Sequence, residues 1–201
     1  MAYRDFKIGE LEKKFGIKQR QAVLFDAVEP IQPSAWLIET LHKKRNSIRS
    51  TTEKAVSEST ISAILTEVQT LNQSTLTLFS GENLNADKSA GLNGEIDFLF
   101  VHRPDVFEVL APVINITESK FNQAIEKSIG QATAQMIGAR VFNQKNKEPI
   151  EVIHGVITDS RSWIFLKLEN NELLVDNHKD YSTSNLSEIL GIFQKIVNFY
   201  N

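Results

Sequence analysis

Two stretches of sequence decide the fold of this chain, GEIDFLFVH at 94–102 and VINITESKF at 113–121. Each is a short run of β-branched and aromatic residues, which is typical of a buried β-strand. The turn signal Arg103-Pro104-Asp105 separates them. Successive side chains of a strand point to opposite faces of the sheet, so we expect one face of the second strand to carry Ile114, Ile116, Glu118 and Lys120.

Further elements extend outward from these two strands. Helical spacing of apolar residues predicts a helix over 58–71, a long helix over 123–143, and a last helix that Asn185 caps and that runs to about residue 200. Alternating or apolar runs predict the remaining strands at 75–79, 149–158, 162–168 and 172–175. The first three strands have short connections and should be antiparallel, whereas the long helix can carry a crossover into the fourth. The prediction is an α/β fold with a mixed sheet flanked by helices.

The pairing register decides which aspartate faces Glu118. If Asp97 is opposite Glu118, the turn centres within residues 103–112, which two prolines bound. If Asp105 is opposite Glu118, that aspartate directly follows Pro104 on a very short strand. Both registers are open, and the first is preferred because it leaves a longer strand on each side.

Residues 1–54 differ from the rest of the chain in charge and pattern. They carry 11 Lys or Arg against 7 Asp or Glu, whereas the whole chain has a net charge of -3. We expect an N-terminal helical extension over 1–54, with a short helix that Ser34 caps and a polar, loop-like stretch at 46–56, and a second domain over 55–201. The basic cluster, with the residues Lys43, Lys44, Arg45, Arg49 and Lys54, is expected to be a solvated surface or a contact for phosphate.

The composition excludes several classes of protein. A chain that is 41% hydrophobic and 23% charged is an ordinary globular one. The absence of Cys excludes disulfides, thiolate metal sites and a cysteine nucleophile. No apolar run approaches the ~20 residues that a membrane-spanning helix needs, and the charged first residues do not look like a signal peptide. A cytoplasmic protein without a membrane partner is the expectation.

The order of these elements and residues resembles the PD-(D/E)XK phosphodiesterase superfamily, whose fold is restriction-endonuclease-like. The matching residues are Asp97 in Gly-x-x-Asp on one strand and Glu118 with Lys120 in Glu-x-Lys on the next. Glu58 stands where some members carry an acidic residue on the first core helix. Gln131 and Gln135 resemble a helix motif of the exonuclease-like branch. The resemblance covers roughly residues 55–168.

The resemblance implies a nuclease with a Mg²⁺ or Mn²⁺ cofactor and a nucleic acid partner, with DNA expected. Asp97, Glu118 and Glu58 would hold the metal, and Lys120 would serve the attacking water or the developing charge. Gln131 and Gln135 are four residues apart, on one helix face, and would support the site. Oxygen ligands suit these cations.

Two alternative functions stay open. The chain could be an inactive nucleic-acid-binding or interaction module of the same fold, or a subunit of a restriction or defence assembly. The role of the apolar last helix is also open, because it could complete the core or pair with a second copy in a homodimer.

Overall fold

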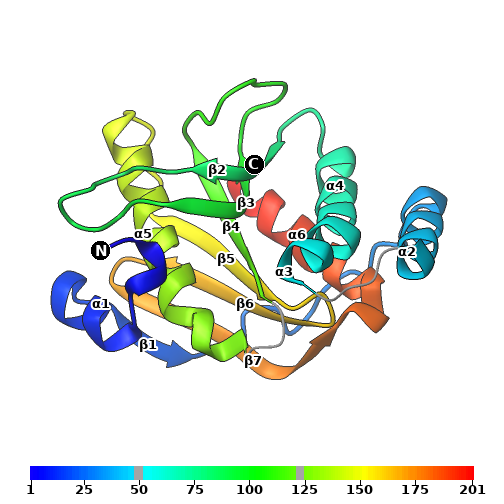
Figure 1. Ribbon diagram of the computed structural model, residues 1–201, viewed down its shortest axis with the longest axis horizontal. Helices are drawn as coiled ribbons and strands as arrows, with labels where there is room; N and C mark the ends of the chain where they lie inside the picture. The colour runs from blue at the N-terminus through cyan, green and yellow to red at the C-terminus, as the bar shows by residue number, and fades with distance from the viewer. Residues whose placement is uncertain (48–51, 121–124) are drawn as a thin grey trace.

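The computed structural model describes residues 1–47, 52–120 and 125–201. Its described strands form one seven-stranded mixed sheet in the order β1-β7-β6-β5-β4-β3-β2, and helices cover both faces (Figure 1). This confirms the predicted mixed α/β architecture. Positions 121–124, where we predicted the end of the third strand and the start of the long helix, lie outside the described residues, as does Arg49 of the basic cluster.

The strand directions agree with the expected connections. β2, β3 and β4 pair antiparallel in sequence, and β4 then pairs parallel with β5. Both pairs that follow are antiparallel, from β5 through β6 to β7. The bounds are β2 (Thr77–Asn83), β3 (Glu95–Val101), β4 (Val113–Ser119), β5 (Val152–Thr158), β6 (Ser162–Glu169) and β7 (Glu172–Ser182).

The register between β3 and β4 is the preferred one. Phe98 pairs with Thr117, so one step further along the strands Asp97 is opposite Glu118. Asp105 lies instead in the exposed connection, with a left-handed backbone (φ 51°). The alternative register, with Asp105 opposite Glu118, is therefore wrong.

A β-bulge corrects one detail of the predicted strand face. The register shifts between Phe100 and Val101, and Val101 pairs with Val113, which leaves Ile114 as the extra residue. Ile114 then packs in the core on one face of the sheet, whereas Ile116 packs in the core on the other. The expectation that Ile114 shares a face with Ile116 and Glu118 is wrong, because the bulge interrupts the alternation.

The helices divide between the two faces. α5 (Ile129–Lys145), which follows the 3₁₀ turn η3 (Ile125–Ser128), packs on β4 and β5, and α1 (Ile8–Phe15) packs against α5. α4 (Ser62–Leu71) and α6 (Leu186–Tyr200) cover the other face, and α2 (Ala35–Ser47) lies outside α4 (Figure 1). The short turns η1 (Tyr3–Asp5) and η4 (Thr183–Asn185) are further helical elements. The apolar side chains of α6 complete the core within one chain, with Ile189, Leu190, Ile192, Phe193, Ile196 and Val197 buried.

The first core helix begins earlier than predicted and is not regular. α3 (Glu53–Val56) starts behind Thr52, whose side chain accepts a hydrogen bond from the amide of Ala55. α3 continues through a π turn, η2 (Ser57–Ile61), into α4. The loop-like expectation for 46–56 is wrong over this part, because Thr52 caps a helix there.

Residues 1–34 pack along the rest of the molecule. β1 (Lys18–Gln21), which we did not predict because all four residues are polar and exposed, pairs parallel with β7 at one edge of the sheet. A side chain at Gly130 of α5 would meet the backbone of Phe6 at 2.5 Å. At the opposite face, a side chain at Gly191 of α6 would meet the carbonyl of Glu29. The predicted domain boundary at 54/55 falls within α3, and the division into two domains stays a prediction.

No helix among the described residues is long and apolar enough to cross a membrane.

Candidate functional site

Glu118 is the buried centre of the site, at the end of β4. Its side chain is 2% exposed. Gln131 donates from Nε2 to Oε1 of Glu118 at 2.5 Å, and Gln135 donates from Nε2 to Oε2 at 2.6 Å. Both amides lie on α5, one turn apart, so this helix fixes the orientation of the carboxylate through both of its oxygens.

Lys120, two residues after Glu118, provides the positively charged group of the site. Its Nζ lies 2.6 Å from Oε1 of Glu118 and 3.7 Å from Oε1 of Glu53. The Lys120 side chain is only 12% exposed. The amide of Lys120 donates to the carbonyl of Thr158 on β5, which anchors its backbone beside the sheet.

Asp97 completes the site from β3, opposite Glu118. Its Oδ2 accepts a hydrogen bond of 2.7 Å from the amide of Ser119. That bond ties the ends of β3 and β4 together, and Oδ1 has no hydrogen-bond partner among the described residues. Asp97, Glu118 and Lys120 therefore converge as the sequence predicted.

The ionisation of the three groups follows from their burial and proximity. Burial, together with the neighbouring carboxylate of Asp97, raises the pKa of Glu118 to about 7, despite the hydrogen bonds from Lys120 and Gln135. Burial also raises the pKa of Asp97 above its usual range. Burial alone would lower the pKa of Lys120, but the carboxylates around it together raise that pKa. An ionised acid pair of this kind is stabilised by any additional positive charge.

Glu58 is the predicted site residue that the structure does not bring to this cluster. Its side chain is 61% exposed and lies 3.8 Å from Nζ of Lys54, in an ion pair on the surface. Glu53, one residue into the same helical segment, provides the acidic side chain beside Lys120 instead.

The π turn explains this exchange. The amide of Ser62 donates to the carbonyl of Ser57, five residues back, so one extra residue is accommodated in the turn. The carbonyl of Glu58 accepts from Nζ of Lys44 and from Oγ of Ser62 instead. In a regular helix, Glu58 would share the face of Ile61, whereas here Val56, five residues before Ile61, is buried and the Glu58 side chain is exposed. Thr52 is a favourable N-cap residue and could have revealed the early start of the helix, but no residue pattern in the sequence predicts the π turn.

Buried polar atoms without a partner remain beside the carboxylates. Within the part of the chain that the structure describes, Oε1 of Gln135 and Oγ of Ser119 have no hydrogen-bond partner, although both residues are buried. Such groups are costly unless water or a ligand satisfies them. Among the described residues, no group of three or more His, Asp or Glu side chains is arranged to hold a metal ion. The donor set at the centre is thus two acidic side chains, with Glu53 joined to them through Lys120.

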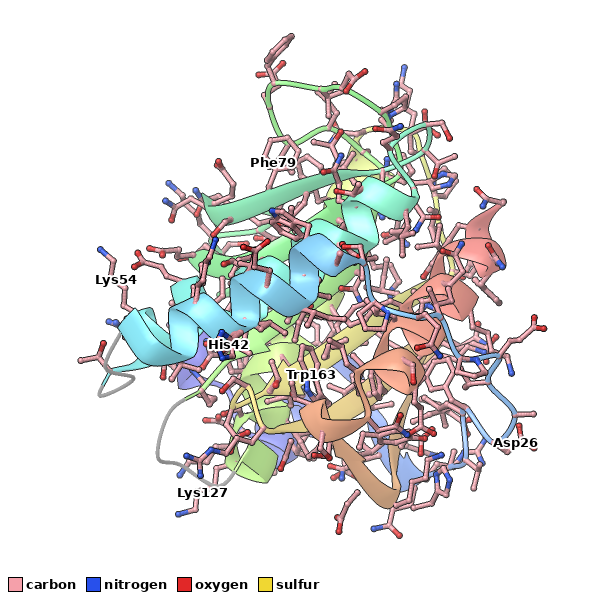
Figure 2. All side chains as sticks on the ribbon, turned by 90° about the vertical axis from the view of Figure 1, so that its right-hand side faces the viewer. Asp26, His42, Lys54, Phe79, Lys127 and Trp163 are labelled. Carbon is pink, nitrogen blue, oxygen red and sulfur yellow. The ribbon has the colours of Figure 1, made fainter. Side chains whose placement is uncertain are left out.

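Exposed basic residues lie on the elements that flank the site. Lys54 is at the start of α3 and Lys127 is on η3, and both side chains are exposed and project from the same side of the molecule (Figure 2). Arg161 is exposed on the turn between β5 and β6, where Asp159 accepts bonds from the amides of Arg161 and Ser162. These cations could meet phosphates that approach the end of β4.

No family model, no curated protein and no solved structure matches the chain.

Proposed function

We propose that this chain is a divalent-metal-dependent nuclease of restriction-endonuclease-like fold that hydrolyses phosphodiester bonds in DNA. The observation that carries the proposal is the convergence of Asp97, Glu118 and Lys120 at the ends of two paired central strands. The order of β2, β3, β4, α5 and β5 supports the proposed fold, because it joins an antiparallel meander to a parallel strand through one crossover helix.

The donor set fits Mg²⁺ or Mn²⁺. Mg²⁺ binds through one or two carboxylates of a protein and usually keeps several waters. Asp97 and Glu118 would hold the ion, with Glu53 at a greater distance in the place predicted for Glu58. Oδ1 of Asp97, which has no hydrogen-bond partner among the described residues, and the raised pKa of both acids support this assignment. When bound, the ion polarises the phosphodiester and lowers the pKa of a bound water.

The other residues of the site would neutralise charge on the reacting phosphate and hold the Glu118 carboxylate in position. Lys120 would contribute positive charge where the phosphorane oxygens become more anionic. Gln131 and Gln135 would hold the Glu118 carboxylate so that its orientation costs no entropy when substrate binds. The unpartnered Oε1 of Gln135 would accept a hydrogen bond from a water molecule at the site.

Cleavage assays with matched variants test the proposal. Plasmid, single-stranded DNA and RNA are incubated with the protein and Mn²⁺ or Mg²⁺, with EDTA as the blank. We expect cleavage of DNA that needs the metal and that falls at least 100-fold in Asp97→Asn and in Lys120→Ala, because both changes remove charge from the reacting centre. Unchanged cleavage in these two variants would contradict the assignment.

A second pair of variants tests the place of the third acid. Glu53→Gln should lower the rate about tenfold or more, whereas Glu58→Gln should leave it within about twofold, since the Glu58 side chain is exposed and forms a surface ion pair with Lys54. If no substrate is cut while DNA is still bound, the inactive binding module is the better reading. A homodimer stays a prediction, and the mass of the protein in solution tests it.

A further inference from the structure

The acidic side chains of the site already have a cation among them. Nζ of Lys120 lies between Glu118 and Glu53, at 2.6 and 3.7 Å from their nearest oxygens, and its charge also acts on Asp97. A surface lysine is free to leave its partner, but this side chain is 12% exposed and pairs with a carboxylate that is 2% exposed. Lys120 is thus a built-in counterion for the buried acids.

This counterion occupies an acceptor position of Glu118. A carboxylate oxygen accepts about two hydrogen bonds. Among the residues that the structure describes, Gln131 and Lys120 fill the two positions at Oε1 of Glu118, whereas Oε2 receives only Gln135. A further cation that approached Glu118 through Oε1 would need the place of the ammonium group, because the amide of Gln131 is fixed on α5.

We propose that the ammonium group of Lys120 occupies the cation position of this site, and that a divalent ion binds by displacing it from Glu118. The inference rests on the proposed metal site. Displacement would give Lys120 a second role. The ammonium group leaves Glu118 but stays close to Asp97, and it can then contact the phosphate of the substrate. Lys120 then weakens metal binding and yet is required for the reaction, two effects that can be measured separately.

Binding of Mn²⁺ alone provides the first test, and it does not depend on activity. Mn²⁺ affinity is measured by electron paramagnetic resonance at pH 8.5, where protons compete least, for the unmodified protein and for Lys120→Met. We expect Lys120→Met to bind Mn²⁺ at least about tenfold more tightly, because a unit charge of the same sign is removed from the immediate surroundings of the ion. Lys120→Gln, which keeps a hydrogen-bond donor without the charge, should also bind more tightly.

Lys54→Met is the matched control. Lys54 is also a lysine near Glu53 in the sequence, but its side chain is 83% exposed and pairs with Glu58. Water screens such a charge, so its removal should change the Mn²⁺ affinity less than about twofold. Circular dichroism confirms that each variant is folded.

Nuclear magnetic resonance of the unmodified protein provides the second test. The ¹³Cε–¹Hε signal of Lys120, assigned by its loss in Lys120→Met, should shift as Mg²⁺ is added, with the same midpoint as binding. The signal of Lys54 should not shift. A Lys120 signal that stays constant while Mg²⁺ saturates the protein would overturn the displacement.

The outcomes separate this inference from the proposed function. If the unmodified protein binds Mn²⁺ and Lys120→Met binds it with equal or lower affinity, the displacement is wrong and the metal site stands. If neither the unmodified protein nor the variant binds Mn²⁺, the metal site itself is wrong, and both proposals fall together.

Discussion

Glu118 should make the stability of the protein depend on pH in an unusual direction. Its pKa rises from an ordinary 4.5 to about 7 in the folded chain, because of burial and the carboxylate of Asp97. Between these two values the folded state binds the proton more tightly than the unfolded state, so the free energy of unfolding falls as pH rises through this window. Protonated Glu118 therefore makes its full contribution to the free energy of unfolding below about pH 4.5, and this contribution is lost above about pH 7.

Comparison with Glu118→Gln isolates this effect. Urea unfolding in EDTA at pH 5 and pH 8 should show the original protein losing about 2–3 kcal/mol relative to the variant between the two values. Burial lowers the pKa of His154 to about 3, which stabilises the fold as pH rises, but that contribution is common to both proteins and cancels. A stability difference that is constant between pH 5 and 8 would contradict the burial argument.

At the scale of single residues, the sequence predicted most of the site for identifiable reasons. Asp97 and Glu118 face each other because the strand register follows from the position of the turn. Lys120 was expected on the same side as Glu118 because side chains two residues apart on a strand share a face. Gln131 and Gln135 meet the same carboxylate because they are one helical turn apart. Glu58 was assigned to the site by the resemblance alone, and the structure places its side chain in a surface ion pair with Lys54.

The π turn of the first core helix is the element that decides which acid reaches the site. It adds one residue to a turn, so the segment before it is rotated by about 100° relative to a regular helix. Glu53 lies on the rotated segment, with its Oε1 3.7 Å from Nζ of Lys120. Lys44 of α2 supports this conformation by donating to the carbonyl of Glu58.

Deleting Thr60 should convert the π turn into a regular helical turn. We expect the variant to remain folded, because the buried residues of α4 keep their positions, and to lose metal-dependent cleavage to the same extent as Glu53→Gln. Thr60→Ala, which keeps the chain length, should cleave at the original rate within about twofold. Full activity in the deletion variant would show that the π turn does not position Glu53.

Other elements were predicted only where burial gives a periodic signal. The central strands β3 to β6 carry apolar side chains, and their approximate positions were correct. β7 continues to Ser182, seven residues beyond its predicted end at 175. Its second half is mostly polar and so gives no apolar run, but Tyr181 is buried in the core and pairs with Trp163 of β6. β2 likewise runs to Asn83, through Gly81 with its positive φ of 71°. The exposed strand β1 has no apolar residue at all.

At the scale of the whole molecule, residues 1–34 join the two faces of the sheet. η1 and α1 lie on α5, β1 extends the sheet beside β7, and the following residues reach α6 (Figure 1). Two amides of this segment, those of Leu24 and Phe25, donate to the buried carboxylate of Asp176 on β7. Since α5 also carries the glutamines that hold Glu118, the N-terminal segment supports the site indirectly, by packing against α5.

Gly130→Ala should reveal this support. In a helix, alanine is normally more stable than glycine by about 0.5–1 kcal/mol, but a side chain at Gly130 would meet the backbone of Phe6 and Lys7 at 2.5 and 2.9 Å. We therefore expect a loss of about 1–3 kcal/mol in urea unfolding and slower cleavage, because the helix that carries Gln131 must shift. Gly9→Ala on α1 is the matched control: nothing lies within 4 Å of its side-chain position, so the ordinary gain in stability should be seen. If both variants gain stability equally, the N-terminal segment does not pack on α5 as described.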